Sequence, residues 1–516
     1  MEEAKEIVEK AVLNGETSLE LSSLELDILP VEFFSETLVY VTVLNLDYND
    51  FQVLPAEISR LSALRVLSAT GNQLKELPET IQELENLQRL HLNENCLREL
   101  PLFLSKLRHL EIVDATGNGI DSWKEGFGEQ LLELRLDENR LSTLPKSLSC
   151  MKNLKVLELG DNNLTSLPDD IGSLMKLEIL NLSQNNITEL PASIGDLPSL
   201  KILDLSGNHI EDLPERFQSA GVIESFFMEK NYVKSLPSWC GSLCNIVNLG
   251  MADNQLVGNP LPDNFGSVSG KSLRTLDLSG NNISQLPDSV GELKHLEKLQ
   301  LGSTICELER RAFQNGNWLH SLPNSFGWMI NLQKLHLDEN LLTELPENFG
   351  SLVNLEWADF GQNRLRKLPE SFCSLTRLWF LQLSQNFLER LPDDFGNLTN
   401  LIELRLSNNY LAELPSSFAN LTNLQTLDLF HNELTKIPKQ LLNLKNNWRG
   451  KTREDYVEPD EEKTVQILNE VDEEEEDYQD DDTDDEEITY SEAALEFAMK
   501  RSLSIWKSHE GRNPCS

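Results

Sequence analysis

A segment of 23 residues recurs along almost the whole chain, and this repeat limits the fold more than any other feature of the sequence. Its clearest copy starts at Leu154 and reads LKVLELGDNNLTSLPDDIGSLMK. The apolar positions that recur in the copies are Leu154, Leu157, Leu159, Leu164, Leu167, Ile171 and Leu174. One coil of this size cannot bury seven apolar side chains alone, so the copies must stack and share a core.

Each part of the repeat predicts a local structure. The alternation from Val156 to Leu159 predicts a short strand with one buried face, which pairs with the strand of the next coil in a parallel sheet. Asn162 follows where the chain turns inward, and a buried amide there must bond to the backbone of adjacent coils. Pro168 has a fixed φ and no N–H, so it suits a return leg outside the sheet. The result is a curved solenoid.

Counting the asparagine step gives the number of coils. Leu24 takes this step in the first coil. The others are Asn49, Asn72, Asn95, Asn118, Asn139, Asn162, Asn185, Asn208, Asn231, Asn254, Asn281, Asn317, Asn340, Asn363, Asn386, Asn409 and Asn432. We therefore predict an α/β solenoid of about 18 coils with a parallel sheet on its concave face.

The pattern LxxLxLxxNxLxxLP, whose final LP begins the return leg LP-xx-I/F-G-x-L, resembles the leucine-rich repeat in its 23-residue form over roughly residues 18 to 445. It is most similar to the intracellular Ras-group repeats of Scribble, Erbin, the Ras-suppressor protein and the Ras–Raf leucine-rich scaffold. This resemblance implies a non-catalytic scaffold in signal transduction. It also implies small GTPases, kinases or phosphatase subunits as partners.

Composition divides the chain into five parts. Residues 1–17 are predicted to form a capping helix, in which Ala4, Ile7, Val8, Ala11 and Val12 share one face. The solenoid follows at 18–438, with an insertion at 303–315 that is either a tolerated loop, a splicing artefact or a binding loop. Residues 439–457 form a cap and linker, 458–487 a disordered acidic segment, and 488–516 an amphipathic helix and tail.

Charge and sequence content exclude several functions. The net charge of −41 disfavours nucleic acid, and no apolar run approaches the roughly 20 residues that span a bilayer. The acidic N-terminus does not resemble a secretory signal, and the seven cysteines are scattered, so we expect the cytoplasm or the nucleus. No phosphate loop, metal constellation or nucleophile with a base is evident. We expect no enzyme activity and no cofactor.

The outward strand positions lie six, four and two residues before each asparagine, and they predict the partner surface. Aromatic residues and arginine, which dominate interface hot spots, gather in the C-terminal half. That patch comprises Trp357, Asp359, Phe380, Gln382, Arg405, Asp428, Phe430 and His431. A second patch comprises Glu158, Asp204, Phe227 and Asp277. The alternative is internal pairing, with Trp357 stacked on Phe380 and Asp428 neutralising Arg405.

The C-terminal segments offer two further interpretations. The acidic segment, with 18 acids and one lysine between 458 and 487, is either a solvated linker or a binder of basic proteins such as histones. Thr483 lies between acids and suits an acid-directed kinase. After it, the helical pattern resembles the ubiquitin-interacting motif at Leu495, Ala498, Met499 and Ser502. The helix either binds ubiquitin or docks on the last coil.

Overall fold

The computed structural model describes residues 2–34, 38–124, 127–217, 221–304 and 315–434. These residues belong to one compact unit, Met1–Asn469. Most of the insertion at 303–315 lies outside them. So do the predicted cap and linker at 439–457, the acidic segment at 458–487 and the helix and tail at 488–516.

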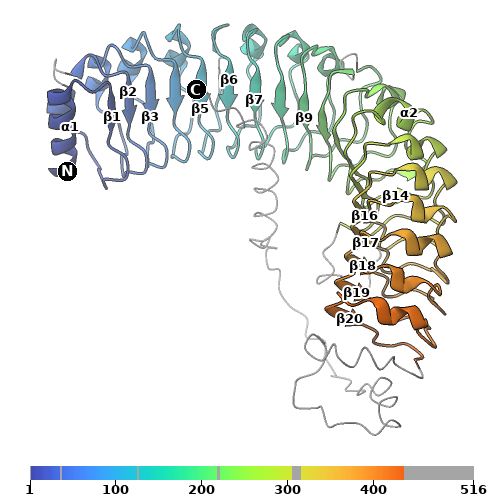
Figure 1. Cartoon of the computed structure of the whole chain (residues 1–516). Coiled ribbons are helices and arrows are strands. Elements are labelled where there is room, and N and C mark those ends of the chain that lie inside the picture. Colours follow the sequence, from blue (N-terminus) through green and yellow to red (C-terminus); the bar gives the residue numbers. More distant parts are fainter. Residues whose placement is uncertain (1, 35–37, 125–126, 218–220, 305–314, 435–516) are drawn as a thin grey trace, which may run out of the picture. The chain divides into compact units, whose positions relative to one another are not determined.

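Eighteen strands of three residues form one parallel sheet in which each strand pairs with the next along the chain. The sheet is open and curved, and its strands follow the inner side of the arc in Figure 1. This confirms the predicted solenoid and its 18 coils. The strands are β1 (Ser18–Glu20), β2 (Val43–Asn45), β3 (Val66–Ser68), β4 (Arg89–His91), β5 (Ile112–Asp114), β6 (Glu133–Arg135), β7 (Val156–Glu158), β8 (Ile179–Asn181), β9 (Ile202–Asp204), β10 (Ser225–Phe227), β11 (Asn248–Gly250), β13 (Thr275–Asp277), β15 (Lys298–Gln300), β16 (Lys334–His336), β17 (Trp357–Asp359), β18 (Phe380–Gln382), β19 (Glu403–Arg405) and β20 (Thr426–Asp428).

The register keeps equivalent residues side by side. Leu157 at the centre of β7 lies opposite Leu180 at the centre of β8, and both side chains are buried. The same alignment holds along the sheet, so residues that share a position in the repeat form columns. Side chains of one column are about 5 Å apart from coil to coil. A second, two-stranded sheet pairs β12 (Val257–Gly258) with β14 (Asn282–Ile283).

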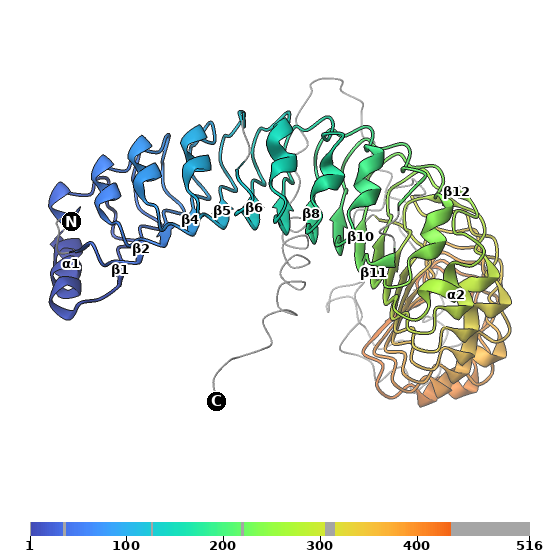
Figure 2. The same cartoon turned by 90° about the horizontal axis from the view of Figure 1, so that it is seen from above.

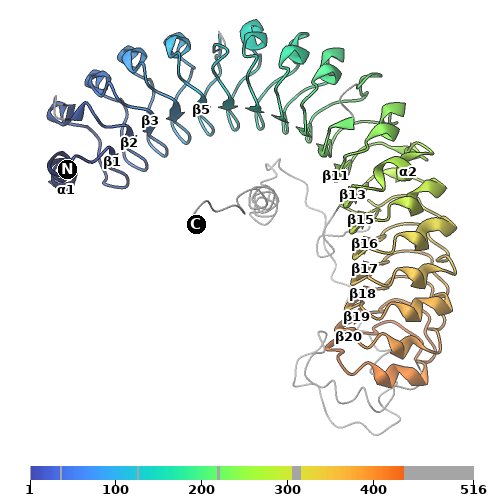
Figure 3. The same ribbon diagram turned by 45° about the horizontal axis from the view of Figure 1, so that its top comes forward.

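The return legs form short 3₁₀ helices on the convex side, outside the strands in Figures 2 and 3. Many begin directly after a proline with φ between −63° and −69°, as at Pro55 and Pro415, which is the conformation that the proline ring favours. The helices are η1 (Val31–Phe34), η3 (Ala56–Arg60), η4 (Glu79–Glu83), η5 (Leu102–Lys106), η6 (Lys146–Cys150), η7 (Ile171–Ser173), η8 (Ala192–Asp196), η10 (Ser238–Ser242), η11 (Asp288–Glu292), η13 (Asn324–Trp328), η14 (Phe349–Ser351), η15 (Glu370–Ser374), η16 (Phe395–Asn397), η17 (Ser416–Asn420) and the α-helix α2 (Phe265–Ser269).

The asparagine column ties neighbouring coils together. Asn185 is 4% exposed, and its amide nitrogen donates to the carbonyl oxygens of Leu159 at 2.9 Å and Leu182 at 3.1 Å. Its side-chain oxygen accepts the N–H of Leu164 at 2.9 Å. Leu159 and Leu164 belong to the preceding coil, so each asparagine satisfies the backbone of two coils. We call this column the asparagine ladder.

The residue before the ladder asparagine has a left-handed backbone in most coils. Its φ is +52° at Gln184, +66° at Gly207 and +50° at His431. Residues other than glycine are uncommon in this region, and asparagine and aspartate visit it most readily. The repeat therefore accepts some backbone strain so that the asparagine can turn inward.

The N-terminal helix α1 (Glu2–Asn14) covers the first strand, and its residues Ala4, Val8 and Ala11 are buried. Ile7 and Val12 pack partly buried against the same core. Gly15 follows with φ +65°, the left-handed conformation that commonly ends a helix. The apolar end of the first coil is thereby shielded from water.

Candidate concave binding site

The concave face is lined by side chains six, four and two residues before each ladder asparagine. In coils β16 to β19 the first two of these columns contain a row of rings. His336 and Trp357 have ring centroids 4.1 Å apart, and Trp357 and Phe380 stack at 4.7 Å with 2° between their planes. The guanidinium of Arg405 lies over the Phe380 ring at 5.6 Å. We call His336, Trp357, Phe380 and Arg405 the concave aromatic row.

The row thus brings together three residues that the sequence predicted for the partner surface. Trp357 and Arg405 are half-buried, whereas Phe380 is only 8% exposed because its ring lies under its neighbours. Arg405 bonds to Glu403 of its own strand, with Nη2 2.7 Å from the carboxylate. The stacking that we considered as the alternative is present, and it leaves Trp357 and Arg405 partly open to solvent.

Two other members of the predicted patch accept hydrogen bonds from the backbone of their own coil. Asp359 accepts the N–H of Gly361 at 2.8 Å, and Gln382 accepts the N–H of Ser384 at 2.9 Å. These side chains are 5% and 3% exposed. The expectation that they face solvent was wrong, because a side chain that folds back onto the backbone two residues later is shielded by the adjacent strands.

Three predicted residues lie at the last described strand. Asp428 accepts the N–H of Phe430 at 3.1 Å, so it also supports the turn after its strand. The Phe430 ring is 46% exposed and meets the exposed His431 imidazole edge-on at 4.2 Å. Phe430 and His431 therefore form an accessible pair next to the concave aromatic row.

The second predicted patch does not form one surface. Asp204 and Phe227 lie opposite each other on β9 and β10, but Glu158 lies on β7 and Asp277 on β13. Asp204 and Asp277 each accept a backbone N–H two residues later. Phe227 and Asp277 are 9% and 7% exposed, so the expectation that they are exposed was wrong. The Phe227 ring packs over Gly250 of the next strand, where there is no side chain to displace it.

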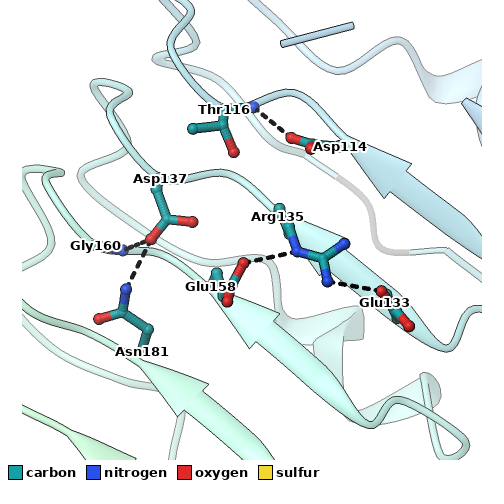
Figure 4. A network of polar contacts seen from close by, with 8 residues as sticks. All are labelled: Asp114, Thr116, Glu133, Arg135, Asp137, Glu158, Gly160 and Asn181. Carbon is teal, nitrogen blue, oxygen red and sulfur yellow. Dashed lines mark hydrogen bonds and ion pairs between the residues drawn. The ribbon is translucent and has the colours of Figure 1, made fainter. Parts of the chain in front are cut away.

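Glu158 belongs instead to a polar network on β5 to β8, which Figure 4 shows. Arg135 lies between two carboxylates, with Nε 2.8 Å from Glu158 and Nη2 2.8 Å from Glu133. Beside it, Asp137 accepts the N–H of Gly160 at 2.8 Å and the amide of Asn181 at 2.9 Å. Sequence reasoning selected only Glu158, because acids on outward positions occur in many coils and do not stand out.

Burial and repulsion between neighbouring carboxylates raise the pKa values of two acids in this network, Asp137 and Glu158. Burial and, to a lesser extent, the neighbouring Glu158 carboxylate together raise the pKa of Asp137 to about 8. Burial also raises the pKa of Glu158, while Arg135 opposes that shift. The network therefore has fewer negative charges at neutral pH than its composition suggests. A partner surface here would meet a partly protonated, hydrogen-bonded cluster.

Two residues of the concave face were missed by sequence reasoning. His336 was not among the predicted residues, but its ring lies 4.1 Å from that of Trp357, with 31° between the planes. Trp379 precedes β18 and meets Phe380 edge-on at 6.0 Å with 39% exposure. The signal that could have identified them is proximity to predicted residues: His336 lies on the strand that pairs with β17, and Trp379 directly precedes Phe380 in the sequence.

Some kinds of site do not occur among the described residues, and several predicted segments lie outside them. Within the described residues, no three side chains of His, Cys, Asp or Glu are arranged to hold a metal ion. No helix in the same ranges is long and apolar enough to cross a bilayer. Thr483, the ubiquitin-binding residues Leu495, Ala498, Met499 and Ser502, and the acidic segment lie outside the described residues, so these proposals stay predictions.

Comparison with known families identifies the repeat. Family profiles described as "Leucine rich repeat", "Leucine-rich repeat region" and "Leucine Rich repeats (2 copies)" match residues 152–210, 320–409 and 399–446. A further "Leucine Rich Repeat" profile matches residues 272–293. A comparison with curated proteins finds no match.

Solved structures share the architecture. A leucine-rich repeat protein of Leptospira interrogans is 27% identical with a TM-score of 0.58, and the match covers 81% of this chain and 97% of that one. YopM from Yersinia enterocolitica is 26% identical with a TM-score of 0.57, covering 87% and 94%. The GASSHO1/SCHENGEN3 ectodomain of Arabidopsis thaliana, in complex with CASPARIAN STRIP INTEGRITY FACTOR 2, is 26% identical with a TM-score of 0.54, covering 84% and 58%.

The repeated strand, the asparagine ladder, the matching profiles and these structures agree with one another. Proteins of this class typically bind other proteins and are rarely enzymes. The chain therefore contains leucine-rich repeats and has the fold of a leucine-rich repeat solenoid.

Proposed function

We propose that this protein is a non-catalytic scaffold that binds another protein through the concave aromatic row and the adjacent Phe430 and His431. The observation that carries the proposal is the row itself, in which an indole, a phenyl ring and a guanidinium share one stretch of the concave face. Tryptophan, tyrosine and arginine are the residues most enriched among interface hot spots. The site has a rigid base because every ring stands on a strand of the sheet.

Charged residues lie around the concave aromatic row and form a polar rim around its apolar centre. Lys334 is exposed and lies opposite Trp357 in the sheet register. Glu403 lies opposite Phe380 and pairs with Arg405. A central aromatic group with charged residues at its edge is the usual organisation of a specific protein interface. The GASSHO1/SCHENGEN3 complex is consistent with binding by this fold.

The kind of partner follows from the resemblance to the Ras-group repeats. We infer a small GTPase, a kinase or a phosphatase subunit in a Ras-type signalling pathway, with the protein acting in the cytoplasm or the nucleus. Such partners are folded, and a concave sheet of several coils offers the extended surface that a folded partner needs.

The test compares two double variants of the full chain expressed in cells. Trp357→Ala with Arg405→Ala removes the centre of the row. Arg89→Ala with Ile112→Ala is the matched control, because these residues occupy the outward position of two adjacent strands near the N-terminus. We expect the first variant to lose co-purifying proteins by at least about tenfold and the control to retain them.

A direct measurement accompanies this comparison. Purified full-length protein is titrated by calorimetry with a Ras-type GTPase loaded with GDP or with a non-hydrolysable GTP analogue. Binding that is abolished by the row variant and kept by the control supports both the site and the partner class. If both variants retain wild-type binding while their circular dichroism spectra are unchanged, the partner contacts another surface.

A further inference from the structure

A second surface lies on the flank that follows the asparagine ladder. After each ladder residue the chain leaves the sheet, and the next residue points to solvent. In earlier coils this position is mostly polar, as at Asp50, Gln73, Asn163 and Asn186. From the thirteenth coil this position is apolar in most coils. Trp318, Phe387 and Tyr410 are 53%, 41% and 50% exposed, and Leu341 is half-buried.

Backbone bonds place these side chains in one column. The N–H of Phe387 donates to the carbonyl of Leu365 at 2.9 Å, and the N–H of Tyr410 donates to the carbonyl of Leu388 at 2.9 Å. The rings of Phe387 and Tyr410 are consequently neighbours, with centroids 6.1 Å apart. Phe387 and Tyr410 therefore form an exposed apolar strip across two adjacent coils, and exposed apolar patches on a protein surface indicate an interaction site.

Four cations adjoin this strip. Arg364 occupies the same column between Leu341 and Phe387, and Arg366, Lys367 and Arg390 stand two or three residues further along the same flank. All four are exposed, and none forms an ion pair in the part of the chain that the structure describes. Glu389 is the one acid at these positions on the two coils. This local excess of positive charge occurs in a protein whose net charge is −41.

We propose that this surface, the cationic-aromatic flank of Phe387, Tyr410, Arg364, Arg366, Lys367 and Arg390, binds an acidic segment of another protein that also carries aromatic side chains. The argument is charge complementarity. Exposed arginines without an internal partner offer charge-assisted bonds to carboxylates, and the planar guanidinium suits bidentate contact. The partner's rings would pack beside Phe387 and Tyr410, which are 41% and 50% exposed.

The chemistry favours a short acidic peptide over a nucleic acid. A nucleic acid has a continuous phosphate backbone and needs a long basic track. Here Glu344 and Glu413 stand on the coils that bracket the four cations, so the positive surface ends within about two coils. A peptide of several acids and two or three rings matches this limited area. The flank is also separate from the concave aromatic row, because it lies beyond the ladder asparagines.

The test uses the full chain and a fluorescent synthetic peptide of mixed glutamate and tyrosine, measured by anisotropy at low and at moderate salt. The key variant is Arg364→Glu with Arg366→Glu. Its matched control is Arg140→Glu with Arg98→Glu, which changes exposed arginines at the same two repeat positions near the N-terminus. A third variant, Phe387→Ser with Tyr410→Ser, removes the rings and keeps the charges.

We expect saturable binding that weakens as salt rises, because surface charges are screened. The key variant should lose affinity by at least about tenfold, since two attractions become repulsions. The ring variant should lose several-fold, and the control should bind like wild type. Absence of saturable binding overturns the proposal and includes the case in which the chain's own acidic segment, 458–487, occupies the flank. Equal loss in the key variant and the control, or tighter binding of a single-stranded oligothymidine, also overturns it.

Discussion

The indole of Trp357 on β17 and the phenyl ring of Phe380 on β18 stack face to face, with centroids 4.7 Å apart and planes 2° apart. The strands place these residues directly opposite each other in the register. If the concave aromatic row binds a partner as proposed, the same stack contributes both to stability and to recognition. The two contributions can be separated by experiment.

A double-mutant cycle measures the stabilising part. Trp357→Leu and Phe380→Leu, made singly and together, should show a coupling of about 0.5–1.5 kcal/mol in the free energy of unfolding, the range typical of an aromatic pair. Denaturant unfolding followed by circular dichroism provides the measurement. The same cycle between Trp357 on β17 and Phe430, which lies just after β20, should give a coupling near zero, because these residues are on coils that do not adjoin. Equal coupling in both cycles would contradict the role of the stack.

Replacing an asparagine of the ladder should destabilise the protein far more than replacing the exposed residue that follows it in the sequence. Asn185→Ala would leave the N–H of Leu164 and the carbonyls of Leu159 and Leu182 without their partner. Each buried unsatisfied group costs about 1–3 kcal/mol, so the free energy of unfolding should fall by more than about 2 kcal/mol. Asn186→Ala, at an exposed position, should change it by less than about 0.5 kcal/mol. A thermal scan of both variants checks the difference.

The glycine of the return leg is required by the spacing of coils. A Cβ built on Gly350 would collide with the carbonyl oxygen of Ser371 in the next coil. Gly350→Ala should destabilise the protein by about 1–3 kcal/mol, because the backbone of one coil must move. Gly119→Ala is the control, since its Cβ would meet the Leu97 carbonyl oxygen at 3.5 Å, an ordinary contact. Similar urea midpoints for the two variants would show that the return legs can separate at little cost.

Asp137 should make stability depend on pH. Burial, with a smaller contribution from the Glu158 carboxylate, raises its pKa in the folded state from an ordinary 3.8 to about 8. Between these values the folded state holds a proton that the unfolded state has released, so this residue's contribution to stability falls as pH rises. Asp137→Asn cannot ionise and can still accept from Gly160. Its melting temperature should exceed that of the wild type by more at pH 9 than at pH 5.

The Glu158 carboxylate provides a second check on the same group. Because Glu158 adds to the pKa of Asp137, Glu158→Gln should move the pH-dependent loss of stability to lower pH. Differential scanning calorimetry across the pH range can follow this shift. A pH profile identical in the wild type and Asp137→Asn would mean that Asp137 ionises normally in the folded protein.

The repeat determined most of the fold from sequence alone. A period of 23 residues, with apolar side chains that no single coil can bury, allows little except a stacked solenoid. The positions of the strands, the inward asparagines such as Asn185 and the prolines of the return legs all follow from that period. These features depend on contacts at a fixed step along the chain, and such contacts can be read from spacing.

Whether each outward side chain is exposed or buried was decided by the tertiary structure. Asp359 and Gln382 occupy outward positions, but they bond to the backbone and are buried. Phe380 is covered, while Phe430 on the same face is exposed. The aromatic column of Phe387 and Tyr410 emerged only once adjacent coils were aligned. The reason is physical: exposure depends on neighbours about 5 Å away on other coils, and the repeat constrains those variable residues only weakly.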